Sequence, residues 1–375
     1  MSRLTDIQRS VAAGGRISAA DALYLLSEAP LQALGSMASD CRYRHNPEKV
    51  VTYIVDRNIN YTNICNVFCK FCAFYRTEKH SDGYTLTFAE ISEKIEEARA
   101  LGATRILLQG GHNEKLDIEF YERMFRHIKT NHVIRNHALG PPEVCHIAKV
   151  SNLTIEETLD RLIAAGLDSM PGGGAEILTE ATRQRISPRK NSPDEWMEVM
   201  RQLHRRKVPT TSTMMLGVGE SLAERVEHLQ RIRDLQDETG GFTSFIPWTF
   251  QPGNTALEKK IEETDSFDYL RTLAVARIYL DNVRHVQLSY VTQGPQIGQL
   301  SLFYGADDFG STMIEENVVS AAGTDFIVGE EELRRLISEA GFEPRLRDDS
   351  YEAFPPLDTV RTVEPLAEVI EEPAA

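Results

Sequence analysis

Hydrophobic and polar positions follow two periods along most of the chain. From about residue 48, short runs rich in β-branched residues alternate with longer segments whose apolar side chains recur every three or four positions. The strand-like runs are residues 50–60, 104–109, 133–139, 167–170, 209–216, 242–250 and 285–291, with a last strand near Phe303 or Thr312. The helical segments are residues 88–100, 118–130, 154–165, 194–206, 221–235 and 267–282, with a further helix near Glu176.

This alternation predicts parallel βα units and therefore an α/β fold. The number of units favours a (β/α)8 barrel of the TIM type, and a doubly wound open sheet is the alternative. Before the barrel, residues 1–47 form a predicted N-terminal helical cap, in which Ser18 can cap a helix. We expect the barrel over residues 48–325, a short C-terminal extension of helix and strand over 326–362, and a disordered acidic tail over 363–375.

Three of the five cysteines lie together directly after the first predicted strand. Cys65, Cys69 and Cys72 have the spacing C-x3-C-x2-C. Thiolates with such short intervals can surround an iron–sulfur cluster from a single loop. Since a 4Fe-4S cluster has four irons, three cysteines leave one iron free to bind a small molecule. The spacing therefore indicates a cluster with one open coordination site.

Two other uses of these cysteines stay open at this point. A structural zinc site usually has four protein ligands, and only His80 follows closely enough to complete one, which would make the chain a zinc-stabilised binding module. A disulfide framework is less favoured, because five cysteines in 375 residues are sparse. The remaining Cys41 and Cys145 are distant in sequence, although they can still approach the loop in space.

Charge and composition exclude some classes of partner. The formal net charge of −15 argues against a nucleic-acid partner and against an anionic membrane surface. No stretch supplies the roughly 20 apolar residues of a membrane span, and the first residues have no apolar run suited to a secretory signal. We therefore expect a cytoplasmic protein whose thiols stay reduced.

In a barrel, the loops that follow parallel strands meet at one face, where catalytic groups collect. Several of these loops are glycine-rich or polar: residues 109–112, 137–143, 170–176, 216–220, 293–298 and 305–317. Glycine permits close backbone approach, but each of these patterns is also typical of an ordinary tight turn. The two late stretches either close over a substrate or form capping turns.

The cysteine loop resembles that of the radical S-adenosylmethionine (radical SAM) superfamily, with Phe71 and Ala73 beside the last cysteine. The resemblance implies that the open iron binds S-adenosylmethionine. It also implies that the reduced cluster cleaves this cofactor to methionine and a 5′-deoxyadenosyl radical. An electron donor of low potential, which the sequence does not identify, must supply the electron.

The same resemblance suggests further cofactor contacts. In this superfamily the loop after the second strand commonly places glycines against the methionyl amino group, which makes Gly110 and Gly111 candidates. Glu176 and Glu220 follow later strands, and the resemblance gives them the role of contacts to the ribose hydroxyls. Solvated loop glutamates are an equally ordinary explanation for both.

Longer patterns narrow the resemblance. The segments NINYTNICNVFCKFCAFYR, LLQGGHNEKLDIEFYE, HALGPPEV, LDSMPGGGAEIL and QLSYVTQGP resemble the dehypoxanthine futalosine cyclase family of the futalosine route to menaquinone. The resemblance extends from residue 50 to about residue 325. Aminofutalosine synthases and deazaflavin synthases share much of the pattern and remain alternatives.

This narrower resemblance implies a nucleoside-derived small-molecule substrate and an intramolecular carbon–carbon bond. The deoxyadenosyl radical would take hydrogen from ribose C4′ of dehypoxanthine futalosine, and the sugar radical would add to the benzoate ring. Loss of one electron and one proton would restore aromaticity. His112, His137 and Glu143 lie on predicted strand-end loops and form our shortlist for the base that takes this proton. A loop histidine is more often an ordinary polar residue.

Overall fold

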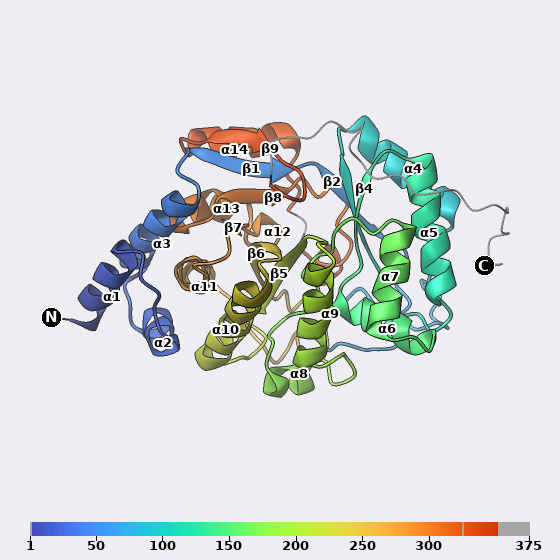
Figure 1. The fold of residues 1–375 in the computed structure, drawn as a ribbon, viewed down its shortest axis with the longest axis horizontal. Helices are drawn as coiled ribbons and strands as arrows, with labels where there is room; N and C mark the ends of the chain where they lie inside the picture. The colour runs from blue at the N-terminus through green and yellow to red at the C-terminus, as the bar shows by residue number, and fades with distance from the viewer. Residues whose placement is uncertain (1, 325, 352–375) are drawn as a thin grey trace.

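The computed structural model describes residues 2–324 and 326–351 (Figure 1). The strands among these residues form three sheets of three parallel strands each. The first sheet has the order β8 (Asp308–Ser311), β1 (Val50–Ile54), β9 (Glu343–Leu346). The second has the order β2 (Asp56–Asn60), β3 (Arg105–Gln109), β4 (Arg135–Ala138), and the third β5 (Thr210–Leu216), β6 (Phe242–Thr249), β7 (His285–Val286).

Single parallel bridges connect neighbouring sheets. They join His137 to Ser169, Met170 to Thr210, and Gln287 to Asp308. Parallel strands that alternate with helices confirm the predicted α/β class. The closure of the three sheets into one continuous barrel stays a prediction, because the ladders themselves end at the borders of each sheet.

The helices between the strands agree closely with the hydrophobic periodicity. They are α4 (Phe88–Ala100), α5 (Ile118–Asn131), α7 (Ile155–Ala165), α9 (Pro193–Arg205), α10 (Leu222–Thr239) and α11 (Ser266–Tyr279). Four of them begin with a capping box, in which a Ser or Thr and the Glu three positions later satisfy each other's backbone N–H groups. Helix α14 (Glu330–Glu339) lies within the segment for which we expect an extension of helix and strand, 326–362.

The N-terminal region is helical, as predicted, with α1 (Arg3–Ala12), α2 (Ala19–Ser27) and α3 (Leu31–His45) at one end of the molecule (Figure 1). Ser18 caps α2 through a capping box with Asp21. Helix α3 packs against α11, and Arg42 near its end donates to the carbonyl of Val50 at 2.6 Å. The cap is thus tied to the first strand of the sheets.

Three predicted strands differ from the structure. The β-branched run at residues 50–60 is two strands rather than one, because β1 pairs with β8 and β9 whereas β2 pairs with β3. Residues 167–170 form bridges only, not a strand. The strand expected at 285–291 stops after Val286, and the polar stretch behind it folds into α12 (Tyr290–Gln293), α13 (Pro295–Ser301) and the short helix η1 (Leu302–Tyr304). Periodicity cannot reveal a change of pairing partner within one run.

Two helices also differ from the expectation. The segment HALGPPE was expected to be a loop, but α6 (Pro141–Val150) begins at its first proline, which suits the first helical position. Glu143 therefore lies in the first turn of a helix. The helix expected near Glu176 is α8 (Glu180–Ile186), and Glu176 precedes it with a φ of 43°.

A further short helix, η2 (Ser320–Ala322), follows β8. The predicted tail at 363–375, and the end of the predicted extension at 326–362, lie outside the described residues. None of the helices in residues 2–324 and 326–351 has the length and apolar character needed to cross a membrane.

Candidate active site

The three cysteines lie on the long loop between β2 and α4, at the carboxyl end of β2. The loop is held to itself by hydrogen bonds from Cys65 N to the Arg76 carbonyl at 3.0 Å and from Arg76 N to the Asn63 carbonyl at 2.8 Å. It is held to the loop after β3 by a hydrogen bond from Asn66 N to the His112 carbonyl at 3.2 Å. Two strand-end loops thus meet at the site that the sequence predicts.

Burial by itself disfavours deprotonation of the cysteine thiols. It raises the pKa of Cys69 to about 12. Burial also raises the pKa of Cys72, although the backbone N–H groups of Tyr75 and Phe74 point at its sulfur and act in the opposite direction. Buried thiolates with amide donors are typical of iron–sulfur ligands, because the irons supply the positive charge that favours the deprotonated form.

A zinc ion and an iron–sulfur cluster, the two metal groups considered for these cysteines, differ in how close together their ligands must lie. Zinc needs all of its ligands within about 2.0–2.3 Å of one point. Within residues 2–324 and 326–351, no three His, Cys, Asp or Glu side chains are grouped closely enough to hold one metal ion. A 4Fe-4S cluster instead takes each cysteine on a different iron, so the thiols stay apart. A cavity of about 400 Å³, lined by Cys69, Cys72, Ala73 and His80, adjoins the loop. These residues fit a cluster.

The glycines after β3 allow close contact with the loop that follows β2. A Cβ on Gly110 would lie 2.5 Å from the ring of Tyr61, and one on Gly111 would lie 2.2 Å from the carbonyl oxygen of Ile64. Both distances are shorter than any real contact, so only glycine allows this approach. Gly110 and Gly111 therefore set the distance between the cysteine loop and the loop after β3.

Glu143 supports this glycine loop from α6. Its Oε1 accepts hydrogen bonds from the Tyr61 hydroxyl at 2.7 Å and from Gly110 N at 3.0 Å. The Tyr61 hydroxyl also lies 3.2 Å from that of Tyr121. Burial raises the pKa of Glu143 to about 7. Glu143 is thus buried behind the loop and is not part of the lining of the central cavity described below.

His112, which is also on our shortlist, faces another space. Its ring packs on His146 with 4.8 Å between the ring centres. Burial lowers its pKa well below the usual value, and His146 and Lys190 lower it further. It lines a cavity of about 790 Å³ between the cysteine loop and α6, together with Cys145. Cys145 therefore lies next to the cysteine loop, across a cavity that is also lined by Asn66 and Phe68 of this loop.

The two predicted ribose contacts have different surroundings. Glu176 lines the central cavity, and its carboxylate accepts from Lys190 Nζ at 2.9 Å and from Arg183 Nη1 at 3.1 Å. The side chain of Glu220 is fully buried within its own loop. It accepts from Arg225 Nε at 2.8 Å and from two backbone N–H groups of the same loop. The role of both residues stays a prediction.

Lys190 is a site residue that sequence reasoning missed. Its ammonium lies 5.5 Å from the centre of the Phe71 ring. Burial acts to lower its pKa, but Glu176 and Cys69 outweigh burial and raise it. Lys190 thus brings a buried positive charge between the cysteine loop and Glu176. Nothing in the polar loop SPRKNSP distinguishes it from a solvated lysine.

A central cavity of about 270 Å³ lies among the strands. Its lining includes apolar side chains from β3 and β6, such as Leu107, Ile246 and Trp248. Its polar lining includes Asn58 from β2 and His137 from β4. Since Glu176 lines it too, the cavity reaches the loops that surround Lys190. His137 is therefore the member of our shortlist that faces a space enclosed by the strands.

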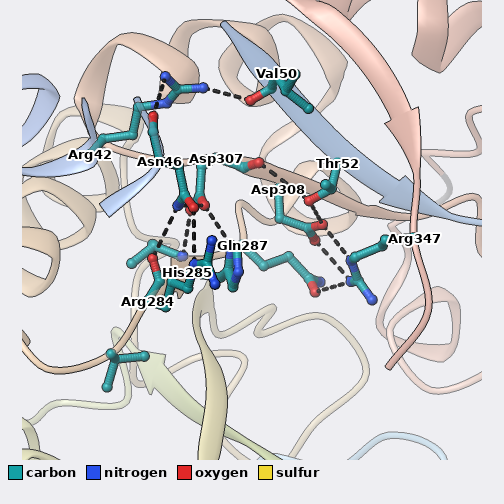
Figure 2. A network of polar contacts seen from close by, with 12 residues as sticks. Arg42, Asn46, Val50, Thr52, Arg284, His285, Gln287, Asp307, Asp308 and Arg347 are labelled. Atoms are coloured by element: carbon teal, nitrogen blue, oxygen red, sulfur yellow. Dashed lines mark hydrogen bonds and ion pairs between the residues drawn. The ribbon is translucent and has the colours of Figure 1, made fainter. Parts of the chain in front are cut away.

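Arg347 and Gln287, two polar residues of the cavity lining, belong to a network of polar contacts (Figure 2). Arg347, which follows β9, donates to Asp308 at 2.9 Å and to Gln287 at 3.3 Å, and Asp308 also accepts from Thr52. Next to it, Asp307 is held by His285 at 2.6 Å. Because the donors of Arg347 are engaged, this arginine is not an open binding group for a substrate carboxylate.

Comparison with known proteins agrees with this geometry. The model of the radical SAM superfamily matches residues 59–232, and that of the CofH/MqnC C-terminal region matches residues 239–359. Cyclic dehypoxanthine futalosine synthase of Halalkalibacterium halodurans is 48% identical over 340 residues, covering 90% of this chain and 92% of that protein. The enzyme of the same name from Streptomyces coelicolor is 47% identical and covers 93% of this chain and 88% of its own.

Aminodeoxyfutalosine synthase of Thermus thermophilus is more distant, with 39% identity over 93% of this chain and 95% of its own. Two solved structures share the fold at low identity. The FeFe-hydrogenase maturase HydG from Carboxydothermus hydrogenoformans has a TM-score of 0.73 and 16% identity, covering 93% of this chain and 80% of its own. Methylornithine synthase (PylB) has a TM-score of 0.70 and 18% identity, covering 90% and 97%.

The parallel α/β fold and the three-cysteine loop define a radical SAM enzyme, which uses a 4Fe-4S cluster and S-adenosylmethionine. Within this class, sequence identity distinguishes between the relatives given above. The two cyclic dehypoxanthine futalosine synthases exceed 45% identity over most of the chain, and the aminodeoxyfutalosine synthase does not. The chain belongs to the family of the cyclic dehypoxanthine futalosine synthases.

Proposed function

We propose that this enzyme cyclises dehypoxanthine futalosine to cyclic dehypoxanthine futalosine in the futalosine pathway of menaquinone biosynthesis. The observation that carries the proposal is the identity of 48% and 47% to two cyclic dehypoxanthine futalosine synthases over about nine tenths of the chain. The reaction joins two parts of one substrate by a carbon–carbon bond and releases methionine and 5′-deoxyadenosine.

The bound cluster and S-adenosylmethionine supply the 5′-deoxyadenosyl radical that starts this chemistry. Cys65, Cys69 and Cys72 hold the cluster in the proposal. Gly110 and Gly111 let the backbone after β3 approach the cysteine loop, and the methionyl amino group binds there. Phe71 and Ala73, on either side of Cys72, complete the cofactor contacts that the family resemblance suggests.

The central cavity is the proposed substrate site. Leu107, Ile246 and Trp248 offer an apolar surface that suits the benzoate ring, and Asn58 offers a polar group for a ribose hydroxyl. For the three sheets to surround such a site, we propose that they close into the (β/α)8 barrel, with the bridges between sheets as seams. The cap at 1–47 then lies outside it, whereas the extension from residue 326 contributes β9, which pairs with β1.

The remaining partners follow from the chemistry. Reduction of the cluster requires an electron donor of low potential, and we propose that the protein works in the reducing cytoplasm, where free thiols persist. The net charge of −15 is unfavourable for a nucleic-acid partner.

Mass spectrometry of one anaerobic reaction tests the proposal. Reconstituted enzyme with reductant, S-adenosylmethionine and dehypoxanthine futalosine should form the cyclic product and 5′-deoxyadenosine together. An aminodeoxyfutalosine synthase, the function of the Thermus relative, would instead leave the adenosyl group in the product. The Cys69→Ala variant should lose cluster iron and both products. Cysteine-independent turnover, or a bound zinc in place of iron, would refute the proposal.

A further inference from the structure

A chain of hydrogen bonds leads from the C-terminal segment to His137. The carboxylate Oδ2 of Asp349 lies 3.0 Å from the hydroxyl of Ser169, and that hydroxyl lies 2.6 Å from Nδ1 of His137. The three residues come from distant parts of the chain: Asp349 follows β9, Ser169 follows α7, and His137 belongs to β4. All three are at least 95% buried.

The donors in this chain are fixed by chemistry. A carboxylate can only accept, so the single hydrogen of the Ser169 hydroxyl points to Asp349. Ser169 can then act toward His137 only as an acceptor, so Nδ1 of His137 carries the ring proton. The neutral ring consequently has its lone pair on Nε2.

The charges around the chain keep these protonation states in place. Burial by itself would raise the pKa of Asp349, but Arg105, whose Nη1 donates to Oδ1 at 2.7 Å, lowers it to about 2. Burial lowers the pKa of His137 to about 3, and Arg105 and Arg347 act in the same direction while Asp349 opposes them. The carboxyl is therefore ionised and the imidazole neutral.

The lone pair of His137 is available to a ligand. Among the described residues, no hydrogen bond reaches Nε2 of His137. This atom is also absent from the polar atoms that are completely buried and lack a hydrogen-bond partner, so it is not closed off by the surrounding protein. The side chain lines the central cavity together with Asn58 and Trp248. An imidazole whose far nitrogen is fixed by a hydroxyl and a carboxylate, and whose near nitrogen meets a cavity, has the arrangement of an oriented base.

We propose that His137 Nε2 is the base that takes the proton from the cyclised ring, and that Ser169 and Asp349 are positioning residues that hold its tautomer. This inference rests on the proposed function. After the sugar radical has added to the ring, the attacked carbon still carries hydrogen. Its proton passes to Nε2. Loss of this proton leaves three electrons on the ring: the two of the former C–H bond and the unpaired electron. Two of them restore the aromatic system, and the third passes to the oxidised iron–sulfur cluster, which is the one-electron acceptor.

The Asp349→Asn variant should reverse the direction of the hydrogen bonds that link residue 349, Ser169 and His137. Because Oδ1 faces the donor Arg105, the asparagine places its carbonyl there and its NH₂ toward Ser169. Ser169 must then donate to Nδ1 of His137, which moves the ring proton to Nε2 and removes the base. Asp348→Asn is the matched control: it makes the same charge change one residue earlier, on a carboxylate that accepts from Ser350 and faces Arg135.

The first experiment reads the tautomer directly, without turnover. In ¹⁵N-histidine-labelled full-length enzyme, NMR should show His137, assigned with a His137→Gln sample, protonated at Nδ1 and bare at Nε2. Asp348→Asn should leave this pattern unchanged, and Asp349→Asn should shift the proton to Nε2. A wild-type His137 protonated at Nε2 would overturn the inference whether or not the proposed function is correct.

The second experiment separates proton transfer from hydrogen abstraction. With dehypoxanthine futalosine, the ratio of cyclic product to 5′-deoxyadenosine should fall about 100-fold in His137→Gln, as expected when a general base is lost. Asp349→Asn should lower the same ratio, while 5′-deoxyadenosine formation persists in both variants and Asp348→Asn keeps the wild-type ratio. An unchanged ratio in folded, cluster-loaded His137→Gln would overturn the base. Absence of any cyclic product from the wild type would refute the proposed function instead, and the tautomer measurement would still stand.

Discussion

Glu143 provides a prediction whose size follows from its surroundings. Its pKa rises from 4.5 to about 7 because the carboxyl is buried. Between these two pH values the native protein keeps a proton that the unfolded chain has released. The free energy of unfolding therefore decreases as pH rises through this window, by about 3 kcal/mol in total. The Glu143→Gln variant should lack this decrease, because glutamine does not titrate.

Glutamine is a close match to the protonated acid at this position. Its Oε1 can accept from the Tyr61 hydroxyl and from Gly110 N, as Glu143 Oε1 does at 2.7 Å and 3.0 Å. Urea unfolding at pH 5 and pH 7.5 measures the effect as the difference between the two pH responses, so groups that titrate equally in both proteins cancel. Wild type should lose stability relative to Glu143→Gln at the higher pH. Parallel pH responses would refute our account of Glu143.

Two further changes test other contacts. Gly111→Ala should prevent 5′-deoxyadenosine formation, because the new Cβ would lie 2.2 Å from the Ile64 carbonyl and displace the cysteine loop. The control is Gly329→Ala, where a Cβ meets nothing within 4 Å. Normal turnover in Gly111→Ala would contradict the close approach. Arg347→Met should lower the free energy of unfolding by about 3–5 kcal/mol, because it leaves buried Asp308 without its cation. Urea unfolding measures this loss, and a wild-type midpoint would show that the ion pair contributes little.

Much of the fold was predictable because local signals and tertiary structure agree. The capping boxes at Thr87, Thr154, Ser192 and Ser221 mark where helices begin, and the apolar periodicity between them gives the faces that pack on the sheets. The break at Val55 was not predictable from pattern, since both halves of the run are buried and only their pairing partners differ. Whether the sheets close into a barrel is likewise decided by pairing rather than by periodicity.

The site was predictable only where chemistry depends on local spacing. Cys65, Cys69 and Cys72 carry their meaning within eight residues of sequence. Lys190, Ser169 and Asp349 do not, because each acts through a partner that is distant in the chain. Burial decides their behaviour, and an isolated lysine, serine or aspartate in a polar segment gives no sign of it.

Deuterium transfer tests the central claim most directly. That measurement uses dehypoxanthine futalosine carrying deuterium at ribose C4′, with anaerobically reconstituted enzyme, reductant and S-adenosylmethionine. If the enzyme begins cyclisation by taking this hydrogen, the 5′-deoxyadenosine released with the cyclic product should contain deuterium by mass spectrometry. Cyclic product accompanied by unlabelled 5′-deoxyadenosine, or an adenosyl group retained in the product, would contradict the account.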